Sequence, residues 1–392
     1  MRASGGDIFA AVKEGFRWHP AARVFDGAGR EYFPVASGGS VIAERPAGVA
    51  LGQAIAAGRF RIGGNGPAPL DGFETLTSGS SGSPRRIARR VASWTASFAV
   101  NGGLFGIGPG VRVAVLGRLT QSLALYGALE AVHLGAEVHL LDDLRPDRQR
   151  KVLAARGVGL LYATPAQMRL LVEAGGPELA LRHLLIGGSK LDDGLRAALL
   201  TLSPGVVVHE FYGAAEASFI TLAGPGCPVG SVGIAYPGVE IRVEGGEIWV
   251  KSPYLFDGYA GEDRGGAVWR DGWLSVGEMG AVRQGFLYLS GRAGRMVTVA
   301  DQNVFPEEIE AFLAGLPGVA RVAVVPRSDA LRGVHLVAVV QGDREQEAAL
   351  LRAARGALGP LKAPKALIWR QDWPVLPSGK TDLRRIAAEV DL

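Results

Sequence analysis

Short apolar runs alternate with longer amphipathic segments between residues 111 and 211 of this chain. The apolar runs have the length of strands, and the segments between them repeat apolar residues at helical spacing. Strands and helices in alternation form βαβ units, in which helices cover both faces of a mainly parallel sheet. The pattern predicts strands at 111–116, 137–141, 158–162, 181–186 and 206–211, and helices at 120–134, 146–156, 165–173 and 191–202.

The pattern changes after residue 224, where the helical period disappears and Gly and Pro separate short β-like runs. This predicts a small antiparallel β unit up to about residue 290. Farther on, helices are predicted at 306–313 and 344–358, and strands at 319–325 and 334–340. The sequence therefore predicts an α/β protein. A large N-terminal domain combines mainly parallel strand-helix layers with the small antiparallel β unit, and a small mobile α+β C-terminal domain follows.

A hydroxyl- and glycine-rich stretch, T-S-G-S-S-G-S-P-R-R at 77–86, precedes the alternating elements. Its glycines allow several backbone N–H groups to turn toward one point, and its hydroxyls add donors, so the stretch can wrap a polyphosphate. Apolar spacing over 87–100 predicts a helix directly after it, with a cluster of arginines that favours an anion. The cluster is Arg85, Arg86, Arg89 and Arg90. A flexible linker is the alternative that composition alone favours.

The carboxyl ends of the predicted parallel strands should meet at one edge of the sheet. Ligands of such sheets bind at this edge. The loops 163–165, 187–190 and 212–216 follow three of these strands. The sequence therefore predicts that these loops lie together and form a binding site.

Composition describes an ordinary globular chain. The chain has 392 residues, of which 48% are hydrophobic and 20% charged, enough for two or three domains. The net charge is only +4, with no basic tail or repeated basic and aromatic pattern, so we expect no nucleic-acid partner. The single cysteine, Cys227, excludes an intramolecular disulfide. No segment reaches the ~18 apolar residues of a membrane span, and we expect a cytoplasmic protein.

Three common enzyme motifs are not present in a usable form. Gly379-Lys380-Thr381 is similar to the end of a P-loop, but Pro374 stands where that motif requires glycine. No G-x-G-x-x-G follows a predicted strand, and no G-x-S-x-G occurs. P-loop, dinucleotide-binding and serine-hydrolase functions are therefore not expected.

A set of motifs in a fixed order resembles the acyl-adenylate-forming (ANL) superfamily, which contains acyl-CoA synthetases, carrier-protein-loading adenylation domains and luciferases. The stretch 77–85 is similar to T-S-G-T-T-G-x-P-K, 212–216 to Y-G-x-T-E, and 271–278 to D-G-W-x-x-T-G-D. Farther along, 304–310 is similar to V-x-P-x-E-I-E and 376–380 to P-x-x-G-K. Each motif alone is weak, but together they span most of the chain.

The resemblance implies activation of a carboxylate by ATP to an acyl-adenylate, followed by transfer to a thiol, usually that of coenzyme A. It implies that Glu216 binds Mg²⁺ and that Lys380 stabilises the adenylation transition state, so that these two are the catalytic residues. The residues that it implies for ATP or AMP binding are Thr77, Ser78, Gly79, Ser80, Ser81, Gly82, Arg85, Gly187, Gly188, Tyr212, Gly213, Ala215, Glu278 and Arg292.

The resemblance also implies an AMP-binding domain at 1–291 and a C-terminal catalytic domain at 292–392 that rotates about a hinge opening with Gly291-Arg292. Some positions depart from the family pattern. Ala300 and Asp301 replace the glycine pair that lines the thiol tunnel in many coenzyme A ligases. Arg85, Ala215, Val276, Glu278 and Gly294 replace the usual lysine, two threonines and two acids. The segment before residue 77 is also shorter than usual.

The acid substrate is not specified by the sequence. We expect its pocket near Gln121, Phe211 and the loop containing Gly187, where apolar walls suit a hydrophobic aryl or alkyl monocarboxylate. Coenzyme A is the expected acceptor. A carrier-protein thiol or an amine is the alternative that Ala300 and Asp301 suggest. The departures elsewhere suggest a third alternative, a non-catalytic relative that binds a nucleotide or a partner. A homodimer stays open.

Overall fold

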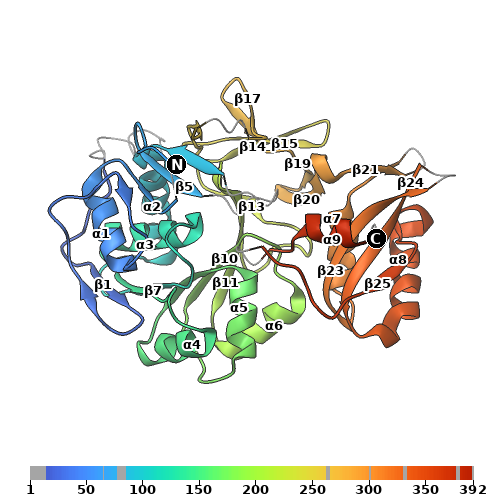
Figure 1. The fold of residues 1–392 in the computed structure, drawn as a ribbon, viewed down its shortest axis with the longest axis horizontal. Coiled ribbons are helices and arrows are strands. Elements are labelled where there is room, and N and C mark those ends of the chain that lie inside the picture. The colour runs from blue at the N-terminus through green and yellow to red at the C-terminus, as the bar shows by residue number, and fades with distance from the viewer. Residues whose placement is uncertain are drawn as a thin grey trace, which may run out of the picture.

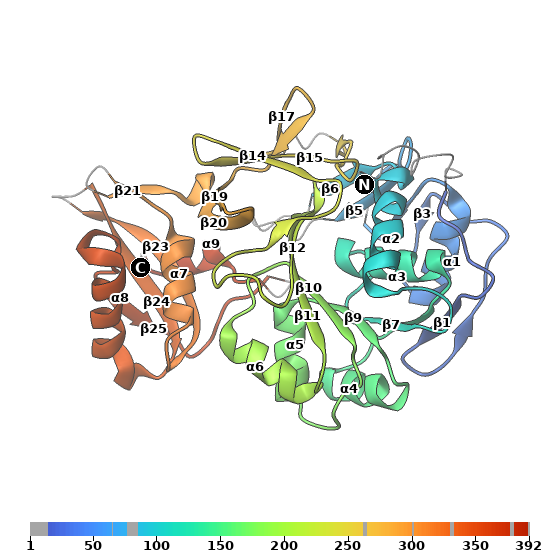
Figure 2. The ribbon, with the colours of Figure 1, turned by 180° about the vertical axis from the view of Figure 1, so that it is seen from behind.

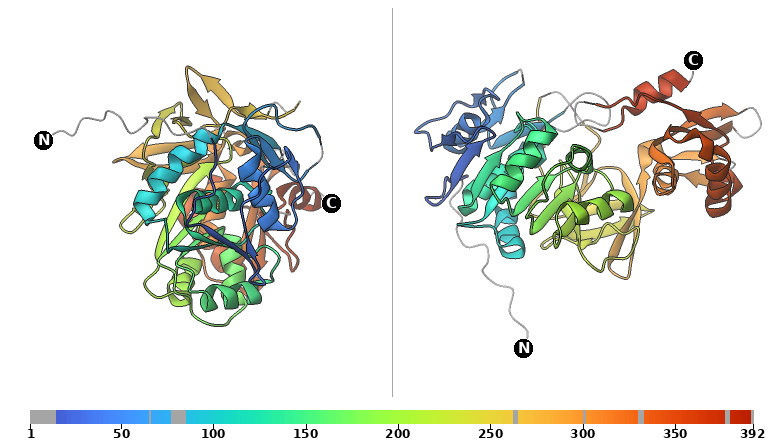
Figure 3. Two further views of the ribbon diagram at one scale, coloured as in Figure 1. Left: turned by 90° about the vertical axis from the view of Figure 1, so that its left-hand side faces the viewer. Right: turned by 90° about the horizontal axis from the view of Figure 1, so that it is seen from below.

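The computed structural model describes residues 15–64, 66–76, 85–261, 265–299, 302–329, 333–376 and 380–390. Successive parts of the chain follow one another from one end of the molecule to the other (Figure 1 and the right-hand view of Figure 3). The N-terminal part lies at one end, and the C-terminal part, from strand β21 (Val297–Val299) onward, lies at the other.

The centre of the molecule is the predicted parallel sheet with its crossover helices. The strands run in the order β11-β10-β9-β7-β8-β1, each parallel to its neighbour. The strands are β1 (Arg23–Asp26), β7 (Arg112–Val115), β8 (Glu137–Leu140), β9 (Leu160–Ala163), β10 (His183–Gly187) and β11 (Val207–Ala214). The helices that pack on them are α2 (Val91–Phe105), α3 (Ser122–Leu134), α4 (Pro146–Ala155), α5 (Pro165–Glu173) and α6 (Asp193–Leu202).

Helices cover both faces of this sheet, as the continuous apolar runs predict. Val113 and Val115 of β7 join one buried cluster with α2 and α3, whereas Ala114 between them joins a second cluster with α4, α5 and α6. Capping residues stabilise the starts of two of these helices. Thr164 and Gln167 form a capping box at α5, and the Asp192 side chain accepts a hydrogen bond from the backbone N–H of Leu195 at α6.

The N-terminal part adds a second sheet and a helical layer to this core. The second sheet has the order β16-β6-β5-β4-β3, and aromatic side chains from several elements pack beneath it. Its elements and the adjoining ones are β1 (Arg23–Asp26), β2 (Glu31–Tyr32), β3 (Val41–Ile42), α1 (Ala47–Ala57), β4 (Phe60–Ile62), β5 (Phe73–Leu76), β6 (Arg86–Arg89) and α2 (Val91–Phe105).

The predicted helix after the hydroxyl-rich stretch is wrong over its first residues. Arg86–Arg89 is strand β6, and helix α2 begins only at Val91. β6 pairs with β5 on one side and with β16 on the other, so its backbone groups are satisfied by partners distant in sequence. Ile87 and Arg89 face the interior.

The predicted antiparallel unit is present and continues the parallel sheet. β12 pairs with β11 in the antiparallel sense, and β13, β20 and β19 extend the same sheet. The strands of this region are β12 (Ser218–Ala223), β13 (Ile234–Ala235), β14 (Glu240–Glu244), β15 (Glu247–Lys251), β16 (Gly258–Tyr259), β17 (Val268–Arg270), β18 (Trp273–Ser275), β19 (Glu278–Arg283) and β20 (Phe286–Arg292).

The C-terminal part is the small α+β unit that the sequence predicts. Helices α7 and α8 pack on the sheet β23-β24-β25 (Figure 2), and α9 belongs to a separate apolar cluster with other side chains of β23 and β24. Besides β21, its elements are η1 (Ala293–Arg295), β22 (Gln302–Val304), α7 (Pro306–Ala314), β23 (Val319–Asp329), β24 (Gly333–Gly342), η2 (Arg344–Gln346), α8 (Glu347–Lys362), β25 (Leu367–Trp369) and α9 (Leu383–Val390). No helix among the described residues is long and apolar enough to cross a bilayer.

Candidate active site

The structure brings together the three loops at the carboxyl ends of the parallel strands. Gly187 ends β10 beside Phe211 of β11, and a Cβ at Gly187 would stand 2.4 Å from the Phe211 ring. Gly188 has a positive φ of 94°, and a Cβ there would lie 3.6 Å from Thr164, in the loop after β9. The glycine pair therefore permits a close approach between backbone and ring that a side chain would block.

Gln121 lies at the same edge of the sheet. It precedes the first residue of α3 and forms a β-bridge with Leu76, the last described residue before the hydroxyl-rich stretch. A Cβ on Gly117 would contact the side chains of both Gln121 and Gln167. Gln167 belongs to the capping box of Thr164, so Gln121 and the 163–165 loop are close neighbours. The acid pocket near Gln121, Phe211 and Gly187 stays a prediction.

A β-bulge shapes the segment that carries the Y-G-x-T-E-like motif. The register between β11 and β12 shifts between Tyr212 and Gly213, and a Cβ on Gly213 would stand 2.0 Å from the carbonyl oxygen of Ser218. Tyr212 is largely enclosed, and burial, with a further contribution from Glu278, raises the pKa of its phenol. Within the described part of the chain, the Tyr212 hydroxyl is buried without a hydrogen-bond partner. It is therefore a polar group available to a ligand.

Glu216 is held at several points in the turn between β11 and β12. Its Oε1 accepts a 2.9 Å hydrogen bond from the Tyr259 hydroxyl, and its backbone oxygen accepts a 2.8 Å bond from the N–H of Phe256. The carbonyl of the preceding residue, Ala215, accepts from the guanidinium of Arg89. Tyr259 occupies Oε1 of Glu216, so the other carboxylate oxygen, Oε2, remains available to a cation.

Arg89 does not belong to a phosphate-facing cluster, contrary to the sequence prediction. Its side chain is buried, donates to the carbonyl of Tyr254 at 2.8 Å, and has its pKa lowered by burial to about 10. Arg86 forms an ion pair with Glu74 at 3.3 Å, and Arg90 forms one with Asp257. Arg86 and Arg89 lie on strand β6 and are engaged within the protein, whereas Arg90 directly precedes helix α2 and its side chain is largely exposed.

Glu278 and Arg292 face each other across β19 and β20. They are direct register partners, and Arg292 Nε donates to Glu278 Oε1 at 2.8 Å. The Glu278 side chain is only 12% exposed, whereas that of Arg292 is 45% exposed. The pair lies close to the buried phenol of Tyr212, whose pKa responds to both charges.

Lys380 of the C-terminal part reaches this same group of charges. Burial and then the charge of Arg292 lower the pKa of its ammonium, whereas Glu278 and Glu216 raise it. The backbone N–H of Leu376 donates a 2.8 Å hydrogen bond to the carbonyl of Lys380. The structure therefore brings together Glu216, Glu278, Arg292 and Lys380, which are widely separated in sequence.

Several residues that the sequence analysis assigned to the site lie outside the described residues. They are Thr77, Ser78, Gly79, Ser80, Ser81, Gly82, Ala300 and Asp301. The hydroxyl-rich stretch connects β5 to β6, whose facing residues at that end are Leu76 and Arg86. Arg85, which follows the stretch, lies 5.9 Å from the ring centroid of Tyr259.

The sequence analysis missed residues that support the site and the hinge. Tyr259 holds the side chain of Glu216, Arg89 holds the carbonyl of the preceding residue, and Arg295 anchors the chain just after the predicted hinge. The Arg295 guanidinium pairs with Glu307 at 3.2 Å and with Glu310 at 2.7 Å, both on α7. No local motif distinguishes these residues, because each partner lies on a different element.

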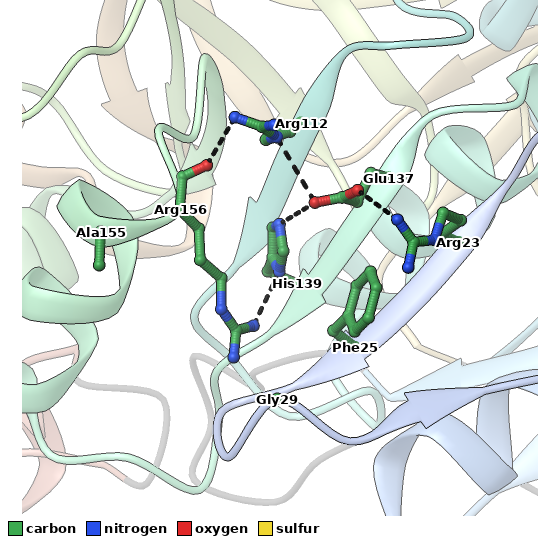
Figure 4. A pocket seen from close by; sticks show the side chains of 8 residues that line it. All are labelled: Arg23, Phe25, Gly29, Arg112, Glu137, His139, Ala155 and Arg156. Carbon is green, nitrogen blue, oxygen red and sulfur yellow. Dashed lines mark hydrogen bonds and ion pairs between the residues drawn. The ribbon is translucent and has the colours of Figure 1, made fainter.

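A cavity lies at the amino ends of the parallel strands and is lined by a network of charged side chains (Figure 4). Glu137 lies among Arg23, Arg112 and His139, at 3.7, 3.5 and 3.0 Å. Arg156 donates to His139 and to a backbone carbonyl. Burial, Arg156 and Arg112 lower the pKa of His139 to about 3, so this histidine is neutral. The cavity lining therefore holds three arginines and one carboxylate, Glu137, so the lining keeps a positive charge.

The oxygen chemistry of the site fits a nucleotide with Mg²⁺. Mg²⁺ prefers carboxylate oxygen together with phosphate oxygens and water, and a single carboxylate suffices when a nucleotide supplies the rest. Among the described residues there is no cluster of three or more His, Cys, Asp or Glu that could hold a metal alone. Glu216 can offer a carboxylate oxygen to a cation whose other ligands are phosphate oxygens and water. The unpartnered Tyr212 hydroxyl gives a ligand a polar group to bind.

Comparisons with known proteins agree with this geometry. Residues 74–260 match the family described as AMP-binding enzyme, and residues 308–380 match the AMP-binding enzyme C-terminal domain. The chain is 32% identical over 332 residues to an uncharacterized acyl-CoA ligase of Bacillus subtilis, YhfT, covering 79% of this chain and 67% of that one. It is 29% identical over 248 residues to the putative long chain fatty acid-CoA ligase VraA of Staphylococcus aureus, covering 61% of this chain and 53% of the relative.

Solved structures share the fold at lower identity. The amide bond synthetase McbA of Marinactinospora thermotolerans has a TM-score of 0.73 at 23% identity, covering 90% of this chain and 80% of that one. The o-succinylbenzoate CoA synthetase MenE of Bacillus subtilis has a TM-score of 0.71 at 23% identity, covering 80% and 68%. With the two family matches and the acyl-CoA ligase relatives, the chain belongs to the acyl-adenylate-forming (ANL) superfamily, in its acyl-CoA synthetase branch.

Proposed function

We propose that this protein uses ATP and Mg²⁺ to convert a hydrophobic aryl or alkyl carboxylic acid into an acyl-adenylate, and then transfers the acyl group to the thiol of coenzyme A. The observation that carries the proposal is the Glu278–Arg292 ion pair near Tyr212, together with the placement of Lys380 within electrostatic range of Glu278 and Glu216. This placement joins an ammonium of the C-terminal part to the two carboxylates that the family motifs assign to ribose and metal. We expect the protein in the cytoplasm, which supplies ATP and coenzyme A.

In the first step a carboxylate oxygen attacks the α-phosphorus of ATP, the bond to the β-phosphate oxygen breaks, and pyrophosphate leaves. Glu278 and Arg292 are suited to hold the ribose hydroxyls, and Tyr212 the adenine ring. Lys380 balances the negative charge that the attacking carboxylate brings to the α-phosphate. Mg²⁺, when bound, neutralises and orients the phosphate oxygens. In the second step the thiol sulfur attacks the acyl carbonyl, AMP leaves, and the thiol proton passes to solvent.

The test is acid-dependent exchange of pyrophosphate into ATP, measured with a panel of aromatic and aliphatic acids. We expect exchange with hydrophobic monocarboxylates. Lys380→Ala should lower it by at least about 100-fold, the usual cost of removing a group that stabilises transition-state charge. Lys151→Ala, at an exposed lysine of α4, is the matched control and should leave exchange unchanged. No exchange with any acid would contradict the proposal.

The two half-reactions separate the role of Lys380 from a general loss of folding. Lys380→Ala supplied with preformed acyl-adenylate should still form the thioester, because that step no longer needs charge at the α-phosphate. Equal loss of both half-reactions would contradict the assigned role. The acceptor is tested by comparing coenzyme A with an acyl carrier protein and with amines. Saturable product formation with coenzyme A alone would exclude the alternative that Ala300 and Asp301 suggest.

A further inference from the structure

We propose that Tyr259 is a positioning residue for the metal ligand: its hydroxyl holds Oε1 of Glu216, so that the carboxylate keeps one orientation toward the Mg²⁺ of the bound nucleotide. The motivating observation is the 2.9 Å hydrogen bond between these two side chains. The inference rests on the proposed function, because that function assigns Glu216 to the metal. It adds a residue that none of the family motifs in the sequence analysis contains.

The direction of this hydrogen bond follows from the chemistry of the two groups. A carboxylate that binds a metal ion can only accept hydrogen bonds, so the Tyr259 hydroxyl donates its proton to Oε1 of Glu216. Glu216 therefore has a hydrogen-bond donor on one oxygen, and the position of this donor sets the orientation of the carboxylate.

The ring of Tyr259 is held in place from several sides. β16 pairs with β6 so that Tyr259 stands opposite Ile87. The ring of Phe256 meets it edge to face at 5.1 Å. A Cβ on Gly265 would stand 2.0 Å from the ring, so the ring packs directly on the backbone of this glycine. The hydroxyl position is thus set by packing, as a positioning residue requires.

The segment that carries Tyr259 also holds the backbone of Glu216. The N–H of Phe256 donates to the Glu216 carbonyl at 2.8 Å, and buried Arg89 joins the carbonyls of Ala215 and Tyr254. Arg89 is the last residue of β6, the strand that follows the hydroxyl-rich stretch. The metal ligand and the strand next to the expected phosphate loop therefore share one rigid frame.

Loss of the hydroxyl should weaken metal-dependent nucleotide binding in particular. Without this bond the Glu216 carboxylate can rotate about its last side-chain torsion, and part of the binding free energy of Mg²⁺ is spent on fixing it. Partners that orient a metal ligand typically change metal affinity by about 10- to 100-fold. We therefore expect Tyr259→Phe to weaken Mg·ATP binding by about 10-fold, and to leave the binding of metal-free ATP unchanged.

The experiment is isothermal titration of the full chain with ATP, in excess Mg²⁺ and again in EDTA. Tyr254→Phe is the matched control, since its hydroxyl donates to the Pro237 carbonyl at 2.7 Å and not to Glu216. This control should bind Mg·ATP like the wild type. The Mg²⁺ concentration for half-maximal pyrophosphate exchange should also rise about 10-fold in Tyr259→Phe, with little change in kcat at saturating Mg²⁺. Near-UV circular dichroism verifies that both variants fold.

The outcomes separate this inference from the proposed function. Equal Mg·ATP affinity in Tyr259→Phe and the wild type would overturn the inference, and so would an equal loss with and without Mg²⁺, which indicates a packing role. Glu216→Gln tests the assignment beneath it. If Glu216→Gln keeps the full Mg²⁺ dependence, the metal assignment in the proposed function is wrong. If Glu216→Gln loses it, Tyr259→Phe in that background should have no further effect.

Discussion

Glu130 should control how the stability of the N-terminal part depends on pH. Its side chain is fully buried on α3. Its Oε1 accepts from Asn101 at 2.8 Å and from the Tyr126 hydroxyl at 3.1 Å, and the Tyr162 hydroxyl contacts Oε2. Burial outweighs these donors and raises the pKa of Glu130 from 4.5 to about 8. The folded protein therefore holds a proton at neutral pH that the unfolded chain has released.

The size of this pH effect on the free energy of unfolding follows from the pKa of Glu130 in the unfolded chain and in the folded protein. Stability associated with this proton is fully present below pH 4.5 and is lost as the pH rises through about 8. Each pH unit between these values corresponds to about 1.4 kcal/mol, so the whole shift is worth at most ~5 kcal/mol. Between pH 5.5 and pH 8.5 the expected loss is roughly 3 kcal/mol. Because α3 begins directly after Gln121 and β9 leads into the 163–165 loop, we expect this loss of stability to affect the expected acid pocket as well.

The assay is urea unfolding of the wild type and of Glu130→Gln at both pH values. Glutamine keeps the shape and can donate to the Tyr162 oxygen, but it binds no proton. We expect the wild type to lose roughly 3 kcal/mol more than the variant between the two conditions. Comparing the two proteins cancels the titration of all other groups. Parallel pH profiles would refute the reasoning, and so would an infrared band of a protonated carboxyl that persists unchanged in Glu130→Gln.

Three further substitutions test the site and the hinge. Gly187→Ala places a methyl group 2.4 Å from the ring of Phe211 and should restrict pyrophosphate exchange to smaller acids. Gly103→Ala is the control, because a Cβ at Gly103 meets no described atom within 4 Å, and it should leave the range of acids unchanged. An unchanged range of acids in Gly187→Ala would contradict the pocket assignment. Arg295→Ala leaves two half-buried glutamates unpaired and should cost ~3 kcal/mol in thermal unfolding. Arg385→Ala, at an exposed pair, should cost much less, and equal losses would count against the anchoring role of Arg295. Glu278→Gln should raise the KM for ATP about 10-fold without changing that for the acid, and an unchanged KM would remove this residue from the ribose site.

The alternating region was predictable because strands of a parallel sheet that is buried on both faces have nearly continuous apolar sequences. All residues of Leu160–Ala163 are buried, and the predicted run at 158–162 shows this as continuous apolar character. The position of the site followed from topology, since loops after parallel strands meet at one edge. The family motifs then supplied the residues that the structure brings to that edge. The domain boundary between 291 and 292 stays a prediction.

Pairing between distant segments was not predictable. Ile87, Val91, Trp94 and Phe98 have helical spacing, yet the first of them lies in strand β6 because β5 and β16 supply its hydrogen bonds. The same error assigned Arg89 to the phosphate side. Tyr259 gave no signal, since it stands in a short glycine-rich β run and its partner Glu216 lies 43 residues away.

The charges around Lys380 connect substrate binding to the position of the C-terminal part. In the ligand-free site Glu278 and Glu216 favour its ammonium, whereas burial and Arg292 oppose it. In the proposed function, a bound nucleotide would engage those same carboxylates through its ribose and Mg²⁺, and the ammonium would then depend on the phosphate and on the attacking carboxylate for compensation. Once pyrophosphate has left, part of that negative charge leaves with it, and the buried ammonium loses its stabilising partners. In the proposed function, adenylation would thus weaken the interaction that holds Lys380 in the site, and this would favour rotation of the C-terminal part before the thiol arrives.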